Sequence, residues 1–228
     1  MARATHVLWV PVIGQRTGFE CGNTALTCVL QYLGRHVSVG EIGRLAGTRA
    51  QGTDHAGMIA AAVATGATVF AKEGGGKAAI KEVVGFISRG LPVICGWWTM
   101  WPGDKVGQVD VDHDPGWTLK EKIARDCGHY SVLRGYTPAT LLFMDPQDGL
   151  AGTTIGYCEY SDSEWLRVWY DTDTDQYQLV KNWYMVVNYE GRRFADEVGA
   201  GTDYPPEGST RARSAGIKSP RGRPTGSG

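Results

Sequence analysis

The sequence predicts an α+β domain in which N-terminal helices pack on an antiparallel sheet. Segments with the apolar spacing of helices dominate the first half of the 228 residues, whereas strand-like apolar runs dominate the second half. That segregation favours helices packed against an antiparallel sheet over an alternating α/β arrangement. Hydrophobic residues make up 42% of the chain, which is enough for one sizeable core, so we expect a single domain.

Four helices are predicted in the first half. In the first of them, apolar residues recur at helical spacing after Cys21, and Gly34 follows the last one. Ser38 and Glu41 form a capping-box pattern at the start of the second. The expected ranges are 21–33, 38–47, 54–67 and 77–90.

Strands are expected mainly in the second half, after an extended lead-in over 7–14. A further short helix is predicted between the later strands, because Ser161 and Glu164 repeat the capping-box pattern. The expected strands are 67–73, 91–98, 129–136, 140–145 and 183–189, and the expected helix is 161–171.

A change in composition predicts the end of the domain near residue 190. Residues 191–228 are rich in Gly, Pro, Ser and Arg, and 209–228 carry five basic residues and no acidic one. We therefore predict a domain over 1–190 with a disordered tail over 191–228, and we expect a chain ending near 190 to fold.

Charge, hydropathy and cysteine usage exclude several classes of function. The formal net charge of −1 argues against a nucleic-acid partner. No secretory signal and no apolar run of membrane-spanning length is visible, which indicates a cytoplasmic protein, with later release still open. The five cysteines are odd in number and include no CxxC pair, so neither a disulfide framework nor a zinc site is predicted.

Cys21 is the candidate nucleophile. It follows a polar loop and opens the first predicted helix, where the N-terminus of a helix favours the negative charge of a thiolate. Such a nucleophile needs an imidazole, an acceptor behind that imidazole, and donors for the oxyanion. The alternative is a packed, inert cysteine.

His129 and Asp145 are the candidate partners of Cys21. His129 starts a strand just after Gly128, and Asp145 ends the next strand before Pro146, which keeps Asp145 extended. Two adjacent antiparallel strands would bring these side chains together. His113 is the rival base, but the acidic residues and proline around it indicate a solvated turn.

Several motifs, in order, resemble a C39-type papain-like cysteine peptidase. They are Gln15 followed by Cys21-Gly22 and a helix ending in QYLG, LPVICGWW, GHYSVLRGY, DPQDG after a strand, and SEWLRVWYD. The resemblance covers roughly 10–190 and implies a papain-like fold and an acyl-enzyme mechanism without a cofactor. By resemblance, Cys21 would be the nucleophile, His129 the general base and acid, Asp145 its orienting residue, and Gln15 an oxyanion donor.

The same resemblance implies a peptide or protein substrate, with no nucleic-acid or membrane partner. We expect the substrate to meet residues near the cleft, namely Gly22, Asn23, His55, Trp97 and Trp98. Asn23 departs from the family pattern, which often has proline there. The segment 99–127 is long for its position and predicts a lid.

An acidic run inside that segment allows a second interpretation. Asp110, Asp112, Asp114 and Glu121 resemble a calcium loop, but the glycine is one position late, which favours a solvated acidic loop. We therefore predict no metal.

Two other functions are compatible with the same fold. Phytochelatin-synthase-like enzymes perform acyl transfer with a similar constellation, and product analysis with an added amine would separate transfer from hydrolysis. A non-catalytic peptide-binding module is the third possibility, although such modules usually lose the cysteine. Labelling by iodoacetamide at neutral pH would separate that module from an enzyme.

Overall fold

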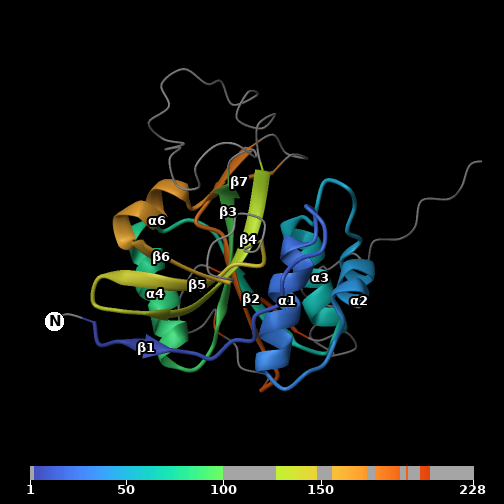
Figure 1. The fold of residues 1–228 in the computed structure, drawn as a ribbon, viewed down its shortest axis with the longest axis horizontal. Coiled ribbons are helices and arrows are strands. Elements are labelled where there is room, and N and C mark those ends of the chain that lie inside the picture. The colour runs from blue at the N-terminus through green and yellow to red at the C-terminus, as the bar shows by residue number, and fades with distance from the viewer. Residues whose placement is uncertain are drawn as a thin grey trace, which may run out of the picture.

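A central antiparallel sheet organises the molecule (Figure 1). The computed structural model describes residues 3–99, 127–147, 156–173, 178–190, 194 and 201–205. The strand order is β10-β2-β9-β3-β4-β5-β6, and β1 also pairs with β4. The strands are β1 (His6–Val7), β2 (Thr68–Lys72), β3 (Val93–Thr99), β4 (Cys127–Tyr136), β5 (Thr140–Met144), β6 (Tyr157–Ser161), β9 (Tyr184–Asn188) and β10 (Thr202–Tyr204).

Helices cover both faces of this sheet. Figure 1 shows one helical layer on the right and another on the left of the strands. The first layer contains α1 (Cys21–Tyr32), α2 (Val39–Ala46) and α3 (His55–Ala64), and the second contains α4 (Lys77–Ser88) and α6 (Asp162–Val168). The mixed helix and antiparallel-sheet architecture predicted from the sequence is therefore confirmed.

Local sequence signals fix several helix ends. The Ser38 hydroxyl accepts the Glu41 N–H at the start of α2, and Gly47 ends that helix with φ of 65°, a conformation that suits glycine. Ser161 and Glu164 form the complete capping box of α6. The four helices predicted in the first half each begin within one residue of the expected start.

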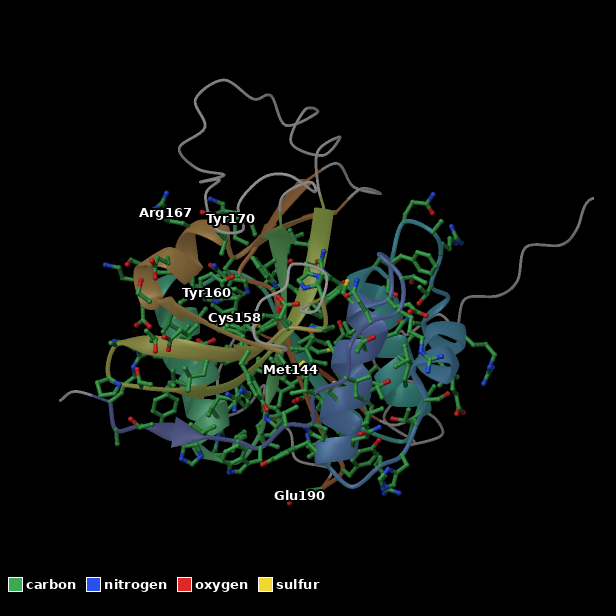
Figure 2. The ribbon with its side chains drawn as sticks, viewed as in Figure 1. Met144, Cys158, Tyr160, Arg167, Tyr170 and Glu190 are labelled. Carbon is green, nitrogen blue, oxygen red and sulfur yellow. The ribbon has the colours of Figure 1, made fainter. Side chains whose placement is uncertain are left out.

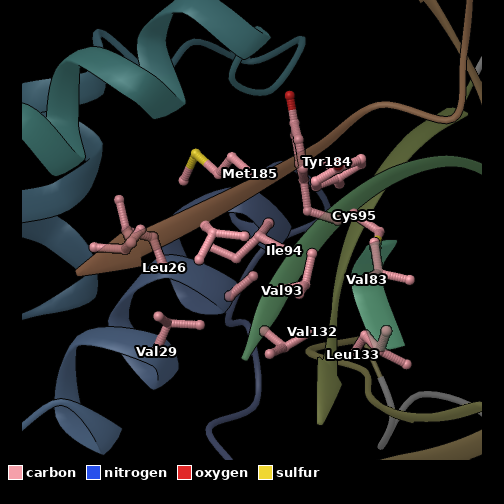
Figure 3. Packing of buried hydrophobic residues seen from close by; sticks show 14 of the residues in the cluster. Leu26, Val29, Val83, Val93, Ile94, Cys95, Val132, Leu133, Tyr184 and Met185 are labelled. Carbon is pink, nitrogen blue, oxygen red and sulfur yellow. The ribbon is translucent and has the colours of Figure 1, made fainter. Parts of the chain in front are cut away.

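Apolar residues on three neighbouring strands form the face of the sheet that packs against α1. Ile94 of β3 lies opposite Val132 of β4 and Met185 of β9. Figure 3 shows these side chains on the side of Leu26 of α1, and all four are fully buried. This packing fixes α1, and therefore its first residue Cys21, against the sheet.

The opposite face carries an aromatic cluster beneath α4. The ring of Phe86 from α4 lies 5.7 Å from that of Phe70 in β2 and 5.0 Å from that of Phe194. Leu133 of β4 lies beside Val83 of α4 on the same face (Figure 3). Thus one residue from beyond position 190 belongs to the core.

The packed body therefore extends past the boundary predicted at residue 190. Phe194 is 0% exposed, and its N–H donates to the Asp203 carboxylate at 2.9 Å. β10 follows and pairs with β2 at the edge of the sheet. Composition alone placed the boundary too early, because one aromatic anchor and a three-residue strand leave no periodic pattern. Residues 206–228 of the predicted tail lie outside the described residues.

Three further strands were not expected from the sequence. β6 extends the sheet beside β5, and Figure 2 labels Cys158 and Tyr160 on it. β7 (Tyr170–Asp173) and β8 (Gln178–Lys181) form a separate two-stranded sheet after α6. The β7 strand brings Asp171 into the neighbourhood of α3.

Candidate active site

Cys21 is the first residue of α1 and is 5% exposed. The preceding Glu20 does not cap the helix with its side chain. Its carboxylate instead accepts the N–H groups of Arg16 and Thr17, both at 3.1 Å, and so folds the preceding loop. The first N–H groups of a helix have no partner within the helix, so this end can stabilise negative charge.

His129 links the start of α1 to the sheet. β4 and β5 pair directly, and His129 Nε2 lies 2.6 Å from Asp145 Oδ1. His129 also hydrogen-bonds the Cys21 thiol. Because Asp145 occupies Nε2, Nδ1 is the ring nitrogen left for the thiol. The expected proximity of His129 and Asp145 is therefore present, with Cys21 on the other side of the ring.

The electrostatics of this group favour an ion pair. Burial alone would lower the pKa of His129, but the charges and hydrogen bonds of Asp145 and Cys21 outweigh burial and raise it to about 10. Burial would likewise raise the pKa of Asp145. His129, the Gln147 N–H and the Ser131 hydroxyl together hold that pKa below its ordinary value. At neutral pH the pair is an imidazolium and a carboxylate.

Gln15 lies in the loop before α1, and that loop is fastened to the end of β5. The Gln15 N–H donates to the Pro146 carbonyl at 2.8 Å, and its side-chain Nε2 donates to the Thr17 carbonyl at 2.8 Å. Its Oε1 is buried without a hydrogen-bond partner in the described part of the chain. The loop that carries Gln15 and the segment that carries Asp145 therefore support each other.

Two residues expected to contact substrate are instead committed to packing at the start of α1. A Cβ on Gly22 would lie 2.7 Å from Met58 Sδ and 3.0 Å from the Tyr130 ring, so glycine permits the close approach of α1 to its neighbours. Asn23 is 2% exposed, and its Oδ1 accepts hydroxyl hydrogen bonds from Thr48 and Thr53.

The two tryptophans expected at the substrate lie in β3. Trp97 is 0% exposed and its indole N–H donates to Ser131 Oγ, so it has no surface to offer a substrate. Strand alternation does not reveal which face of a strand is buried, so the sequence could not show that Trp97 is enclosed. The side chain of Trp98 lies outside the described residues.

His55 forms a second histidine–aspartate pair. Its Nε2 lies 2.8 Å from Asp171 Oδ2, and its ring stacks on Trp183 with 4.0 Å between ring centroids. Tyr130, which lies near Gly22 at the start of α1, meets both the His55 ring and the Trp183 ring edge-on, at 5.9 Å and 5.8 Å. A Cβ on Gly96 would lie 2.9 Å from His55 Nε2, so this strand position must be small.

Ser131 and Asp171 were not singled out from the sequence. For Ser131 a signal existed, because it is two residues from His129 and therefore shares its face of β4. For Asp171 no local signal existed, because its partner His55 is 116 positions away.

Other expectations fall on the part of the chain that is not described. These are the interior of the predicted lid over 99–127, the rival base His113, and the acidic residues Asp110, Asp112, Asp114 and Glu121. Among the described residues, no cluster of three or more His, Cys, Asp or Glu could hold a metal ion. Within the same residues, no helix has the length and apolar character to cross a bilayer.

Two other cysteines, Cys28 and Cys95, lie buried in the core. Burial raises the pKa of Cys28 to about 12, although hydrogen bonds with the backbone of Ile13 and of Cys28 itself oppose the shift. Burial also raises the pKa of Cys95 well above its ordinary value. Both side chains are therefore held as unreactive thiols.

Comparisons with known proteins give one family and several fold relatives. A family model described as "Peptidase_C39 like family" matches residues 7–177. A 55-residue stretch is 44% identical to the uncharacterized protein MTBMA_c00490 of Methanothermobacter marburgensis. That match covers 24% of this chain and 39% of the relative's length.

Solved structures share the fold at low sequence identity. A candidate C39-like peptidase from Bacillus anthracis is similar with a TM-score of 0.56 and 17% identity, over 82% of this chain and 98% of that one. The peptidase domain of Streptococcus ComA, a bi-functional ABC transporter, gives a TM-score of 0.48 and 16% identity, over 78% of this chain and 97% of that one. The Bacillus anthracis likeness identifies the papain-like fold.

Proposed function

Because the chain belongs to the Peptidase_C39 like family, we propose that it is a cysteine peptidase that cuts a peptide or isopeptide bond with Cys21, His129 and Asp145. One observation carries this proposal. The imidazole of His129 is shared between the carboxylate of Asp145 and the thiol of Cys21. A nucleophile, a base and an orienting group in this sequence of contacts form the minimal apparatus for acyl transfer through a thioester.

The charges supply the reactive form of the thiol. The His129–Asp145 ion pair places a positive ring beside Cys21, and the N-terminus of α1 adds favourable backbone dipoles. Both stabilise the thiolate, which is the species that attacks a carbonyl carbon. Cys28 and Cys95 have neither an imidazolium nor a helix N-terminus beside them in the described structure, so Cys21 is the cysteine suited to this role.

The reaction has two steps. The Cys21 thiolate adds to the substrate carbonyl, the C–N bond breaks, and the leaving amine takes the proton from the His129 imidazolium. Water then attacks the thioester while neutral His129 accepts its proton. The C–S bond breaks, the acid product leaves, and the ion pair is restored.

The oxyanion that forms in each step needs donors. The Cys21 N–H at the start of α1 is one candidate. Gln15 is the other, because its side-chain amide has a second N–H besides the one that donates to Thr17. The hydrogen bond from the Gln15 N–H to Pro146 holds this loop beside the Asp145 segment.

His55 remains the candidate substrate contact among the described residues. Its side chain is 20% exposed, and it lies against Tyr130 near the start of α1. Trp98, whose side chain lies outside the described residues, also stays a proposed substrate contact. The proposed substrate is a peptide or a protein.

Two measurements test the proposal. Limited iodoacetamide at neutral pH, followed by peptide mapping, is expected to label Cys21 before Cys28 and Cys95. A peptide library incubated with the protein is expected to show cleavage that Cys21→Ala abolishes without loss of folding. Cleavage that survives in Cys21→Ala would rule out this mechanism, and products joined to an added amine would assign the enzyme to acyl transfer.

A further inference from the structure

A chain of hydrogen bonds runs behind the candidate active site. The indole N–H of Trp97 donates to Ser131 Oγ at 2.9 Å, and Ser131 Oγ donates to Asp145 Oδ2 at 3.2 Å. The direction is fixed by chemistry, because an indole can only donate and a carboxylate can only accept. The single hydroxyl proton of Ser131 must therefore point at Asp145.

This chain holds the oxygen of Asp145 that His129 does not use. Asp145 Oδ1 accepts from His129 at 2.6 Å and from the Gln147 N–H at 2.9 Å. Ser131 is the donor to Oδ2. Because His129 and Gln147 hold Oδ1 while Ser131 holds Oδ2, the carboxylate cannot rotate without breaking hydrogen bonds on both oxygens.

Water from bulk solvent cannot replace these hydrogen bonds, because the residues that make them are buried. Trp97 and Ser131 are 0% exposed and His129 is 2% exposed, so bulk water does not reach them. Register places Trp97 directly opposite His129, and the two rings meet edge-on at 5.6 Å. Trp97 thus packs against the imidazole and also donates into the chain that holds its carboxylate.

We propose that Ser131 and Trp97 are positioning residues that keep the Asp145 carboxylate aimed at His129 and so maintain the thiolate of Cys21. This inference rests on the proposed function, because it gives these two residues a part in the same reaction. Neither residue touches the substrate. Their effect reaches Cys21 only through Asp145 and His129.

A neighbouring tryptophan supplies a matched control. Trp165 of α6 lies 5.4 Å from Trp97 between ring centroids and is also 0% exposed. Its indole nitrogen has no hydrogen-bond partner in the described part of the chain. Trp165→Phe therefore removes the same atoms from the same cluster as Trp97→Phe, without removing a hydrogen bond to the site.

The test is the rate of iodoacetamide alkylation of Cys21 as a function of pH, measured by peptide mapping. Without the Ser131 hydroxyl the carboxylate is free to turn away, the imidazolium is held less strongly, and Cys21 is less well activated for alkylation. On the acid limb of the profile, Ser131→Ala is expected to react about 10-fold more slowly than wild type, and Trp97→Phe about 3-fold more slowly. Trp165→Phe should keep the wild-type profile.

The outcomes separate this inference from the proposed function. If Cys21 of the wild-type protein does not react selectively, the proposed function itself fails. If it reacts selectively but both Trp97→Phe and Ser131→Ala give the profile of Trp165→Phe, the positioning role is overturned and the function stands. Thermal melting of all three variants accompanies the profiles. A loss of stability with an unchanged profile would show a purely structural role and would also overturn the inference.

Discussion

Phe194 is expected to anchor the C-terminal segment to the core, and Phe194→Ala measures that anchor. The ring is 0% exposed and meets Phe86 edge-on at 5.0 Å and Phe70 at 6.2 Å. The guanidinium of Arg89 lies over its face at 5.3 Å. Truncating a fully buried phenylalanine removes its transfer free energy and leaves a cavity, which costs about 3 kcal/mol.

Urea unfolding followed by tryptophan fluorescence is the assay. With a denaturant slope of about 2 kcal/mol/M, the midpoint of Phe194→Ala should fall by about 1.5 M. Phe194→Leu keeps most of the apolar volume and should lose only about 1 kcal/mol. Trp9→Ala truncates an aromatic residue that is 81% exposed, so it should change the free energy of unfolding by less than about 0.5 kcal/mol.

A chain ending at residue 190 provides a second form of the same test. It lacks Phe194 and β10, and it should be destabilised at least as much as Phe194→Ala, whereas a chain ending at residue 205 should keep wild-type stability. If Phe194→Ala and the chain ending at 190 both unfold at the wild-type urea midpoint, the segment contributes nothing to the core and this reasoning fails.

Three other predictions concern the site and its surroundings. His129→Ala should lower peptide turnover about 1,000-fold. Asp145→Ala should lower turnover less, because an orienting residue does not itself move the proton. Equal turnover in Asp145→Ala and wild type would refute this prediction. Because the folded-state pKa of His129 is raised from 6.5 to about 10, its stabilisation is complete below pH 6.5 and is lost as pH rises toward 10. The difference in melting temperature between wild type and His129→Gln should therefore shrink over that interval, and a constant difference would contradict the raised pKa. Gly96→Ala places a Cβ 2.9 Å from His55 Nε2 and 3.0 Å from Asp171 Oδ2. It should therefore lower the free energy of unfolding, measured in urea, by about 2 kcal/mol. An unchanged free energy of unfolding would show that the His55–Asp171 pair can move aside.

The features that the sequence predicted best have local causes. Apolar spacing and caps such as Ser38 and Ser161 fixed the helices, because these signals act within one turn. The meeting of His129 and Asp145 was also predictable. It needs only two consecutive strands joined by a short turn, and Pro146 marks where the second one ends.

The features that escaped prediction depend on contacts between distant segments. Asp171 meets His55 only because β7 lies beside the start of α3, 116 positions away in the sequence. Phe194 enters the core as a single residue, and no periodicity can reveal such an anchor. Trp97 was expected to contact substrate because nothing in LPVICGWW shows that its side chain is buried. Its burial and its place opposite His129 appear only in the folded sheet.

The order of the elements along the chain also determines when the proposed chemistry can first occur in the cell. α1, with Cys21, is synthesised more than a hundred residues before β4 and β5 supply His129 and Asp145. At about 5–20 residues per second, a nascent chain spends on the order of ten seconds with Cys21 made and His129 not yet made. The order of synthesis therefore delays the meeting of Cys21 with its proposed partners. A chain that ends before His129 would therefore lack both the base and the orienting carboxylate of the proposed mechanism.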